Sequence, residues 1–389
     1  MKKKIQEERS VAVQRFIQGE NPAALCAAVG KSTRWLYKWV ARHIPDDPVW
    51  CEDLSRRPHT SSHRTPEEIE DIVEMVRLSL YNKDRFCGDQ AIQWEMKDME
   101  VQPIPSLRTI SRILCRRELT HRRTGRYEPK GKAYPVLPMH LPNQTQQVDL
   151  VGPCYLSRQI RFYSLHSIDI AINRCGIEPM PSKAAQSIID AVYAVWKRMG
   201  IPENLQVDNE MAFFGSPSHP RGMGPLIRLC LLYGVDLWFI PPAEPWRNGV
   251  VEKFNDHYRQ MFLSKVTMTS EPELRQASLA YEHTHNSTYR YSKIKGQTPL
   301  KALARSGRQL IFPDRNKAPQ YPLEKPEKGL YHLVRFIRSD RKLNIFGEMF
   351  SVPSETQYEY VVATIDVKEQ KLKLFLDKIQ VEEYKYRLR

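Results

Sequence analysis

Apolar residues recur at helical spacing through the first 117 residues, in two groups of three short segments. The pattern over residues 6–43 predicts a helix over IQEERSVAVQRFIQ, a short helix over PAALCAAV and, after a turn at Gly30, a third helix over TRWLYKWVARH. Ser32 or Thr33 is expected to cap the third helix. A short helix, a glycine turn and a further helix form the order of a helix-turn-helix.

The last of these helices carries basic residues on one side and apolar residues on the other. Arg34, Lys38 and Arg42 can face a phosphate backbone, while the leucine and the tryptophans between them face a core. A small helical bundle with a solvated basic face is the alternative, because three-helix units are common.

A second helical group follows residues 46–64, a linker rich in proline, serine and histidine. Helices are predicted from Thr65 to Leu80, over 88–98, and from Ser106 through LRTISRILCRREL. Two tethered helix-turn-helix units can recognise a long DNA site. The residues of the second unit expected to contact DNA are Arg108, Arg112, Arg116 and Arg117.

From residue 145 the pattern changes to alternating apolar and polar positions. Three strands, a helix, a strand, a helix, a strand and a helix predict an α/β core with a mixed five-stranded sheet. Short alternating strands near the end predict a small β-barrel. The expected organisation is an all-α helix-turn-helix pair (1–45 and 65–117) joined by a linker (46–64), a basic linker (118–144), the core with a helical extension (145–300) and the C-terminal barrel (325–389).

The composition of the 389-residue chain favours a protein that binds a polyanion and argues against one that spans a membrane. Its formal net charge of +14 favours a polyanionic partner. The most apolar stretch, 226–242, is interrupted by charges and too short to span a bilayer, so a cytoplasmic protein is expected, associated with the nucleoid if the source is bacterial. The seven cysteines include no Cys-x-x-Cys pair and are expected to be reduced thiols. His59 and His63 have the spacing of a zinc pair, but no cysteine pair completes a site.

Three acidic residues carry the candidate chemistry. Asp149 lies inside the first predicted strand, Asp208 ends the fourth strand, and Glu252 lies on the helix after PPAEPWRNG. A carboxylate within an apolar strand is costly unless something balances its charge, and hard oxygen ligands suit Mg²⁺ or Mn²⁺. The pattern therefore predicts a site for two divalent ions that stabilise the attacking and the leaving oxygen of an in-line displacement.

The segments QVDLVG, QVDNE and RNGVVEKFND, in this order, resemble the Asp-Asp-Glu catalytic core of retroviral-type integrases and insertion-sequence transposases. The resemblance covers residues 145–265, and the helical arm and β-rich tail resemble the layout of bacterial insertion-sequence transposases. It implies an RNase H-like fold and a metal-dependent polynucleotidyl transferase that cuts DNA at element ends and joins a 3′-hydroxyl to target DNA. Carried onto this chain, the metal ligands and catalytic residues are Asp149, Asp208 and Glu252.

One departure from the family pattern lies between Asp208 and Glu252, where the chain is longer than is usual. The extra residues are expected in a loop, FGSPSHPRGMG at 214–224, where an insertion has a small entropic cost. This leaves Glu244 and Glu210 as alternatives for the third ligand. Glu252 is preferred because it follows Asn-Gly at the start of a helix.

Basic residues around Glu252 are further candidates for DNA contact. Lys253 and Arg259 can hold a phosphate, and Arg247 with Trp246 can clamp an unpaired base; a solvated helix face or a packing role is the alternative for each. The expected partners are double-stranded DNA, at element ends and at the target, and further copies of the chain on that DNA. A DNA-binding regulator and a nuclease that only hydrolyses DNA are the competing functions.

Overall fold

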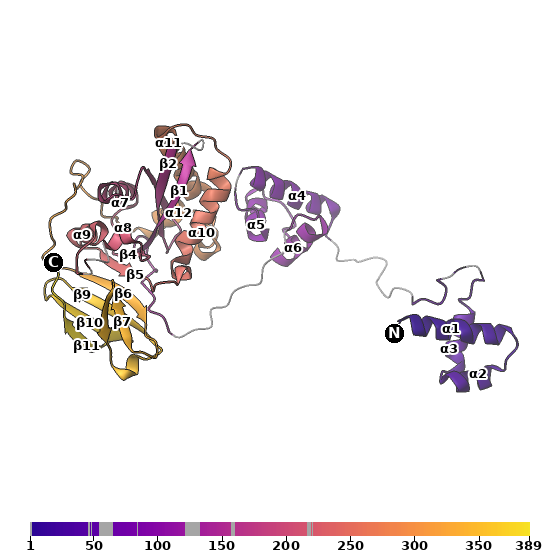
Figure 1. The fold of residues 1–389 in the computed structure, drawn as a ribbon. Helices are drawn as coiled ribbons and strands as arrows, with labels where there is room; N and C mark the ends of the chain where they lie inside the picture. The colour runs from indigo at the N-terminus through magenta and orange to yellow at the C-terminus, as the bar shows by residue number, and fades with distance from the viewer. Residues whose placement is uncertain are drawn as a thin grey trace. The chain divides into compact units, whose positions relative to one another are not determined.

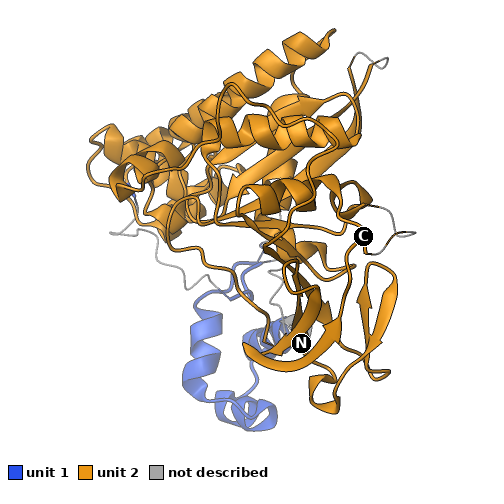
Figure 2. Cartoon of the chain, turned by 90° about the vertical axis from the view of Figure 1, so that its left-hand side faces the viewer, with its two compact units in different colours: residues 1–65 blue, residues 66–389 orange. Residues whose placement is uncertain are grey.

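The computed structural model describes residues 2–45, 47, 49–53, 65–83, 85–120, 133–156, 160–215, 219 and 221–389. The chain divides into two compact units, residues 1–65 and residues 66–389 (Figure 2). Much of both predicted linkers lies outside the described residues, as do His59 and His63. No helix within the described ranges is long and apolar enough to cross a lipid bilayer.

The first unit holds the three helices that the sequence predicts, α1 (Lys2–Ile17), α2 (Pro22–Val29) and α3 (Thr33–Val40) (Figure 1). The side chain of Asn21 accepts hydrogen bonds from two backbone N–H groups at the start of α2. Gly30 ends that helix with a φ of 67°, a left-handed conformation that costs glycine little. Ala12, Leu25 and Leu36, one from each helix, are fully buried together.

The second unit begins with the other expected helical group, α4 (Glu67–Asn82), α5 (Asp89–Asp98) and α6 (Leu107–Arg116). Val73, Ile92 and Ile110 are fully buried between these helices. The connection from α5 to α6 runs over residues 99–106, so it is longer than the turn of three or four residues in a compact helix-turn-helix. The assignment of this group as a helix-turn-helix stays a prediction.

From residue 145 the chain folds around a mixed sheet. Its first five strands are β1 (Thr145–Leu156), β2 (Ile160–Asp169), β3 (Cys175–Met180), β4 (Asn204–Val207) and β5 (Asp236–Phe239). They lie in the order β3-β2-β1-β4-β5, with antiparallel pairing from β3 to β1 and parallel pairing from β1 to β5. This confirms the mixed five-stranded core and agrees with the expected RNase H-like arrangement.

Helices cover both faces of this part of the sheet (Figure 1). α7 (Ala185–Met199) and α9 (Pro225–Leu232) pack on one face, and α10 (Gly249–Tyr258) and α11 (Glu271–Thr288) pack on the other. Since successive side chains of a strand alternate between faces, Val148 joins the core with α7, whereas Asp149 meets α10. The remaining short elements around the core are α8 (Met211–Phe214), η1 (Pro245–Asn248), η2 (Arg259–Leu263), η3 (Ser292–Ile294) and α12 (Pro299–Ser306).

The small C-terminal β-barrel that the sequence predicts is not confirmed, because most of its strands join the core sheet. β6 (Leu330–Phe336) pairs in parallel with β5, and β9 (Tyr360–Asp366), β10 (Lys371–Leu376) and β11 (Ile379–Lys385) extend the same sheet to nine strands. β7 (Lys342–Ile345) and β8 (Glu348–Ser351) pair only with each other among the described strands, and η4 (Ser354–Thr356) leads to β9. Alternating apolar and polar residues predict that these segments are strands. They do not show that the free edge of β5 would pair with β6.

The predicted insertion at 214–224 fastens the C-terminal strands to the core. Its described residues after α8 form no helix or strand. Arg221 makes a two-pronged ion pair with Glu348 on β8, with N–O distances of 2.9 and 2.5 Å. Phe214 stacks on Phe346, with ring centroids 4.5 Å apart. The extra length between Asp208 and α9 therefore makes contacts within the protein.

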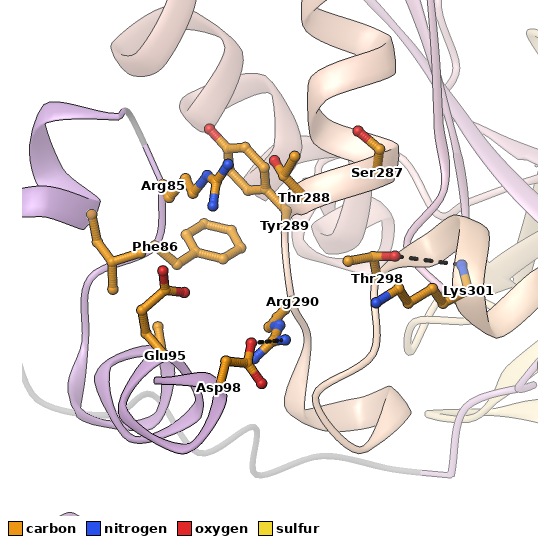
Figure 3. Close-up of a pocket in the computed structure, with 12 residues that line it drawn as sticks. Arg85, Phe86, Glu95, Asp98, Ser287, Thr288, Tyr289, Arg290, Thr298 and Lys301 are labelled. Carbon is orange, nitrogen blue, oxygen red and sulfur yellow. Dashed lines mark hydrogen bonds and ion pairs between the residues drawn. The ribbon is translucent and has the colours of Figure 1, made fainter. Parts of the chain in front are cut away.

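The second helical group contacts the core through an aromatic residue between α4 and α5. Phe86 packs edge-on against His257 of α10 and against Tyr289, which follows α11, at centroid distances of 4.9 and 4.8 Å. Arg290 is ion-paired with Asp98 beside a hollow of about 250 Å³, which residues of both parts line (Figure 3). The helical group thus touches α10 directly.

Candidate active site

Asp149 lies in the middle of β1, and both oxygens of its carboxylate accept hydrogen bonds. Oδ1 accepts from the backbone N–H of Leu150 (2.8 Å), and Oδ2 accepts from the side-chain amide of Asn255 on α10 (2.6 Å). Burial raises the pKa of Asp149, the two hydrogen bonds lower it, and the negative charge of Glu252 raises it further. The carboxylate is therefore held jointly by its own strand and by α10.

Asp208 follows directly after β4, and its Oδ1 accepts a hydrogen bond from the backbone N–H of Glu210 (3.1 Å). Burial raises the pKa of Asp208 to about 6, and the charges of Asp149 and Glu210 act in the same direction. The ammonium of Lys183 lowers that pKa, and it lies 2.8 Å from a carboxylate oxygen of Glu210. A cation is thus already near the second aspartate, but it is paired with a different acid.

Glu252 lies in the first turn of α10, and two glutamines determine where this helix begins. Oε1 of Gln147 accepts hydrogen bonds from the backbone N–H groups of residues 250 and 251, both at 3.1 Å. These donors lack a partner within the helix. The side-chain amides of Gln147 and Gln206 both donate to the carbonyl oxygen of Arg247, at 3.3 and 2.8 Å. The strands that carry the aspartates therefore also hold the start of the helix that carries Glu252.

Neither glutamine was expected to belong to the site, although the sequence contains a signal for both. The tripeptide Gln-Val-Asp occurs at 147–149 and again at 206–208. Gln147 and Gln206 are register partners in the parallel pair of β1 and β4. Residues two apart on a strand share a face. Gln147 and Asp149 of the first tripeptide therefore both face α10. In the second tripeptide Gln206 faces the same side, and Asp208 follows the end of β4. Asn255, also missed, stands three residues after Glu252 on the same helix.

The three carboxylates influence one another. Burial is the largest cause that raises the pKa of each, and mutual charge adds to it: Glu252 acts on Asp149, Asp149 acts on Asp208, and Asp208, after Asp256, acts on Glu252. Within the described ranges, no three side chains among Asp, Glu, His and Cys are gathered closely enough to hold a metal ion. The chemistry of this set, three carboxylates that offer oxygen donors and negative charge, fits a hard divalent cation. In the described part of the chain, the three carboxylates do not by themselves form a complete set of metal ligands.

The two alternative ligands are engaged elsewhere. Glu210 is paired with Lys183. Glu244 accepts from Nε of Arg247 (3.0 Å) and from the hydroxyl of Tyr360 on β9 (2.8 Å). Glu252 has no ion pair with another described residue, so its carboxylate is less engaged than those of Glu210 and Glu244. Its role as the third ligand stays a prediction.

The basic residues near Glu252 differ in how free their charged groups are. The guanidinium of Arg247 is paired with Glu244 and lies 3.8 Å from the ring centroid of Tyr134, so it is used within the protein. Lys253 is exposed, 4.0 Å from Asp256. Arg259 is exposed, and its positive charge opposes the increase in pKa that burial causes at Asp149. Of the three, Arg259 is the one whose charge reaches the first aspartate.

The basic residues of the two helical groups also include some that interact within the protein and some that are exposed. Arg116 and Arg117 of the α6 end are ion-paired with acids of α4, and Arg42 lies over the ring of Trp39 at 5.0 Å. Among the candidate residues of these two groups, Arg34, Lys38, Arg108 and Arg112 are exposed and have no ion pair with another described residue; the ammonium of Lys38 also lies 5.4 Å from the ring centroid of Trp39.

Residues 233–299, which include β5, Glu252, Asn255 and α11, match the family model of the integrase core domain. This segment of the chain is therefore similar to the integrase core domain. The matched segment covers the helix that bears the third acid and the helix that packs beside it. The two aspartates precede this segment, and the strand pairing brings them to it.

Solved integrase structures are similar to parts of this chain at low identity. The catalytic core domain of HTLV-2 integrase in complex with magnesium shares 17% identity over 42% of this chain and 97% of its own, with a TM-score of 0.33. The catalytic core domain of BIV integrase shares 16% identity over 42% of this chain and 95% of its own, also with a TM-score of 0.33. A simian T-cell lymphotropic virus intasome, in complex with PP2A regulatory subunit B56 gamma, shares 14% identity over 80% of this chain and 96% of its own, with a TM-score of 0.37. At these scores the fold assignment depends on the strand order and the family match.

Proposed function

We propose that this chain is a DNA transposase or integrase that binds the ends of a mobile element, cleaves them and joins them to target DNA. The observation that carries the proposal is that the three acids stand on β1, directly after β4 and on α10, and that Gln147 and Gln206 join both strands to the start of this helix, next to an integrase core match. In this proposal, Asp149, Asp208 and Glu252 hold two Mg²⁺ or Mn²⁺ ions. When bound, such ions stabilise the attacking and leaving oxygens of phosphoryl transfer.

The chain's own residues prepare the site. Gln147 and Gln206 hold the start of α10 against the two aspartate strands, and Asn255 orients the carboxylate of Asp149. Burial and mutual repulsion make the negative charges costly, so a bound cation would relieve that cost. In this proposal, Arg259, which is exposed and whose charge acts on Asp149, contacts a DNA phosphate.

Recognition of element ends is assigned in this proposal to the two helical groups. Arg34 and Lys38 on α3, and Arg108 and Arg112 on α6, leave their charged groups exposed. Phosphate contacts of this kind give affinity and register on a duplex. Since one chain carries one set of three acids and an element has two ends, we further propose that at least two chains act together on DNA.

A strand-transfer assay tests the proposal. The full chain is mixed with labelled duplexes that tile the DNA flanking its coding sequence, a supercoiled plasmid and Mn²⁺. Joined products are expected with the native chain and with Asp190→Asn, which alters an exposed acid on α7, and are expected to be absent with Asp149→Asn.

Three results would contradict the proposal. Cleavage without joining would indicate a nuclease that only hydrolyses DNA. Specific binding without any change to the DNA would indicate a regulator. Joining that persists in Asp149→Asn would exclude this residue from the metal site.

A further inference from the structure

A chain of hydrogen bonds leads from Asp149 into the buried core. The side-chain amide of Asn255 donates from Nδ2 to Oδ2 of Asp149, and its Oδ1 lies 2.6 Å from Nδ1 of His166, each on a different element. His166 is the register partner of Asp149 in the antiparallel pair of β1 and β2, and its side chain is fully buried. No role has been assigned so far to this histidine.

The direction of these bonds determines which nitrogen of the histidine carries hydrogen. A carboxylate only accepts, so the amide group of Asn255 must face Asp149 and its carbonyl must face His166. Nδ1 of His166 must therefore be the N–H. Nε2 is buried with no hydrogen-bond partner in the described structure, and an N–H at this position would be an unsatisfied buried donor.

The ring of His166 is also held in place sterically. It packs edge-on against Phe254 and Tyr258 of α10, with centroid distances of 5.4 and 4.4 Å. Burial lowers the pKa of His166 to about 4, so the ring is neutral near pH 7, in agreement with the single N–H. Ring packing and hydrogen bonding both keep Nδ1 directed at Asn255.

We infer that His166 is a positioning residue for the first aspartate of the site, acting through the orientation of Asn255. Without the Nδ1 donor, the carbonyl oxygen of Asn255 loses its buried partner, and the bond to Asp149 becomes the only one of these two hydrogen bonds that still orients the amide. The carboxylate would then lose the orientation in which its remaining lone pairs are available to a cation. This inference rests on the proposed function, because it concerns how Asp149 is prepared for a metal ion.

Two substitutions separate the hydrogen bond from the ring packing. His166→Phe keeps an aromatic ring between the same neighbours but removes the donor. His166→Asn loses the ring but can place an amide N–H near the former position of Nδ1. If positioning is the role, His166→Phe should weaken Mn²⁺ binding by about tenfold, the lower end of effects for residues behind metal ligands, whereas His166→Asn should remain closer to the native affinity.

The measurement is the concentration of free Mn²⁺, followed by electron paramagnetic resonance during titration of each full-length variant, with metal-free thermal unfolding as a check on folding. Equal Mn²⁺ affinity of His166→Phe and the native chain would overturn the inference alone. A greater loss in His166→Asn than in His166→Phe would also overturn it, in favour of ring packing. Failure of the native chain to bind Mn²⁺ more tightly than Asp149→Asn would overturn the proposed function, and the inference with it. Histidine ¹⁵N spectra of the native chain provide a test that needs no variant, because hydrogen on Nε2 of His166 would contradict the arrangement.

Discussion

Gln147 and Gln206 lie side by side on β1 and β4, and the amide groups of both donate to one acceptor, the carbonyl oxygen of Arg247. α10 begins two residues after that carbonyl. The shared acceptor links β1, which contains Asp149, and β4, which Asp208 follows, to the helix that carries Glu252. The relative placement of the three acids therefore depends on two neutral residues.

The two glutamines should differ in their contribution to stability. Gln147→Met removes the acceptor for two backbone N–H groups at the start of α10, whereas Gln206→Met removes donors only. Because a buried donor left without a partner costs about 1–3 kcal/mol, the free energy of unfolding should fall more for Gln147→Met. Urea denaturation measures this difference, and equal losses would show that the capping bonds are not what Gln147 contributes.

Asp208→Asn should abolish strand transfer and, without metal, stabilise the chain near pH 8. The pKa of Asp208 is raised from 3.8 to about 6 in the folded chain, so the folded state binds this proton more tightly than the unfolded state. Native stability should therefore decrease as pH rises from about 4 to about 6, by at most about 3 kcal/mol, and remain lower above that range. The amide removes this dependence.

Thermal unfolding in EDTA at pH 4.5 and pH 8 tests this expectation. The gain in melting temperature of Asp208→Asn over the native chain should be larger at pH 8 than at pH 4.5, and Asp190→Asn should show no such pattern. A variant less stable than the native chain at pH 8 would mean that the charge of Asp208 is stabilised in the fold.

Arg112 and Arg117 stand close together at the end of the second helical group but should behave differently. Arg112 is exposed without an ion pair to another described residue, whereas Arg117 is ion-paired with Asp71 and Glu74 at 2.7 and 2.9 Å. Arg112→Ala should weaken DNA binding and reduce the slope of log affinity against log salt by about 1. Arg117→Ala should mainly lower the melting temperature.

Fluorescence anisotropy with a labelled duplex at several salt concentrations provides the slopes. If Arg117→Ala reduces the slope while Arg112→Ala leaves it unchanged, the DNA-binding face of this group has been assigned to the wrong residues.

Arg221→Ala should loosen the attachment of the β7–β8 hairpin to the core. The guanidinium makes two bonds to Glu348 and lies 4.9 Å from the ring centroid of Tyr386. Arg221→Lys keeps the charge but cannot form the two-pronged pair, so it should show an intermediate effect. Hydrogen exchange across residues 342–351 should be faster in both variants, and unchanged exchange would indicate that the insertion does not fasten the hairpin.

Much of the fold could be predicted because helices and strands depend on local patterns. The helical groups, the five core strands and the position of Asp149 within a strand all follow from periodicity and from capping residues such as Asn21 and Gly30. Asp149 is conspicuous in the sequence alone, since a charged residue inside an apolar strand is costly. The assignment of Asp149, Asp208 and Glu252 to one metal site stays a prediction.

Other features depend on contacts between residues that are far apart in the chain. His166 and Asn255 are separated by 89 positions, and Arg247 and Tyr360 by 113. The sequence could not show that Arg247 is paired within the protein or that the C-terminal strands extend the core sheet. Periodicity specifies which face of an element is apolar, whereas the partner of a polar group or of a strand edge is determined only when the folded chain brings distant segments together.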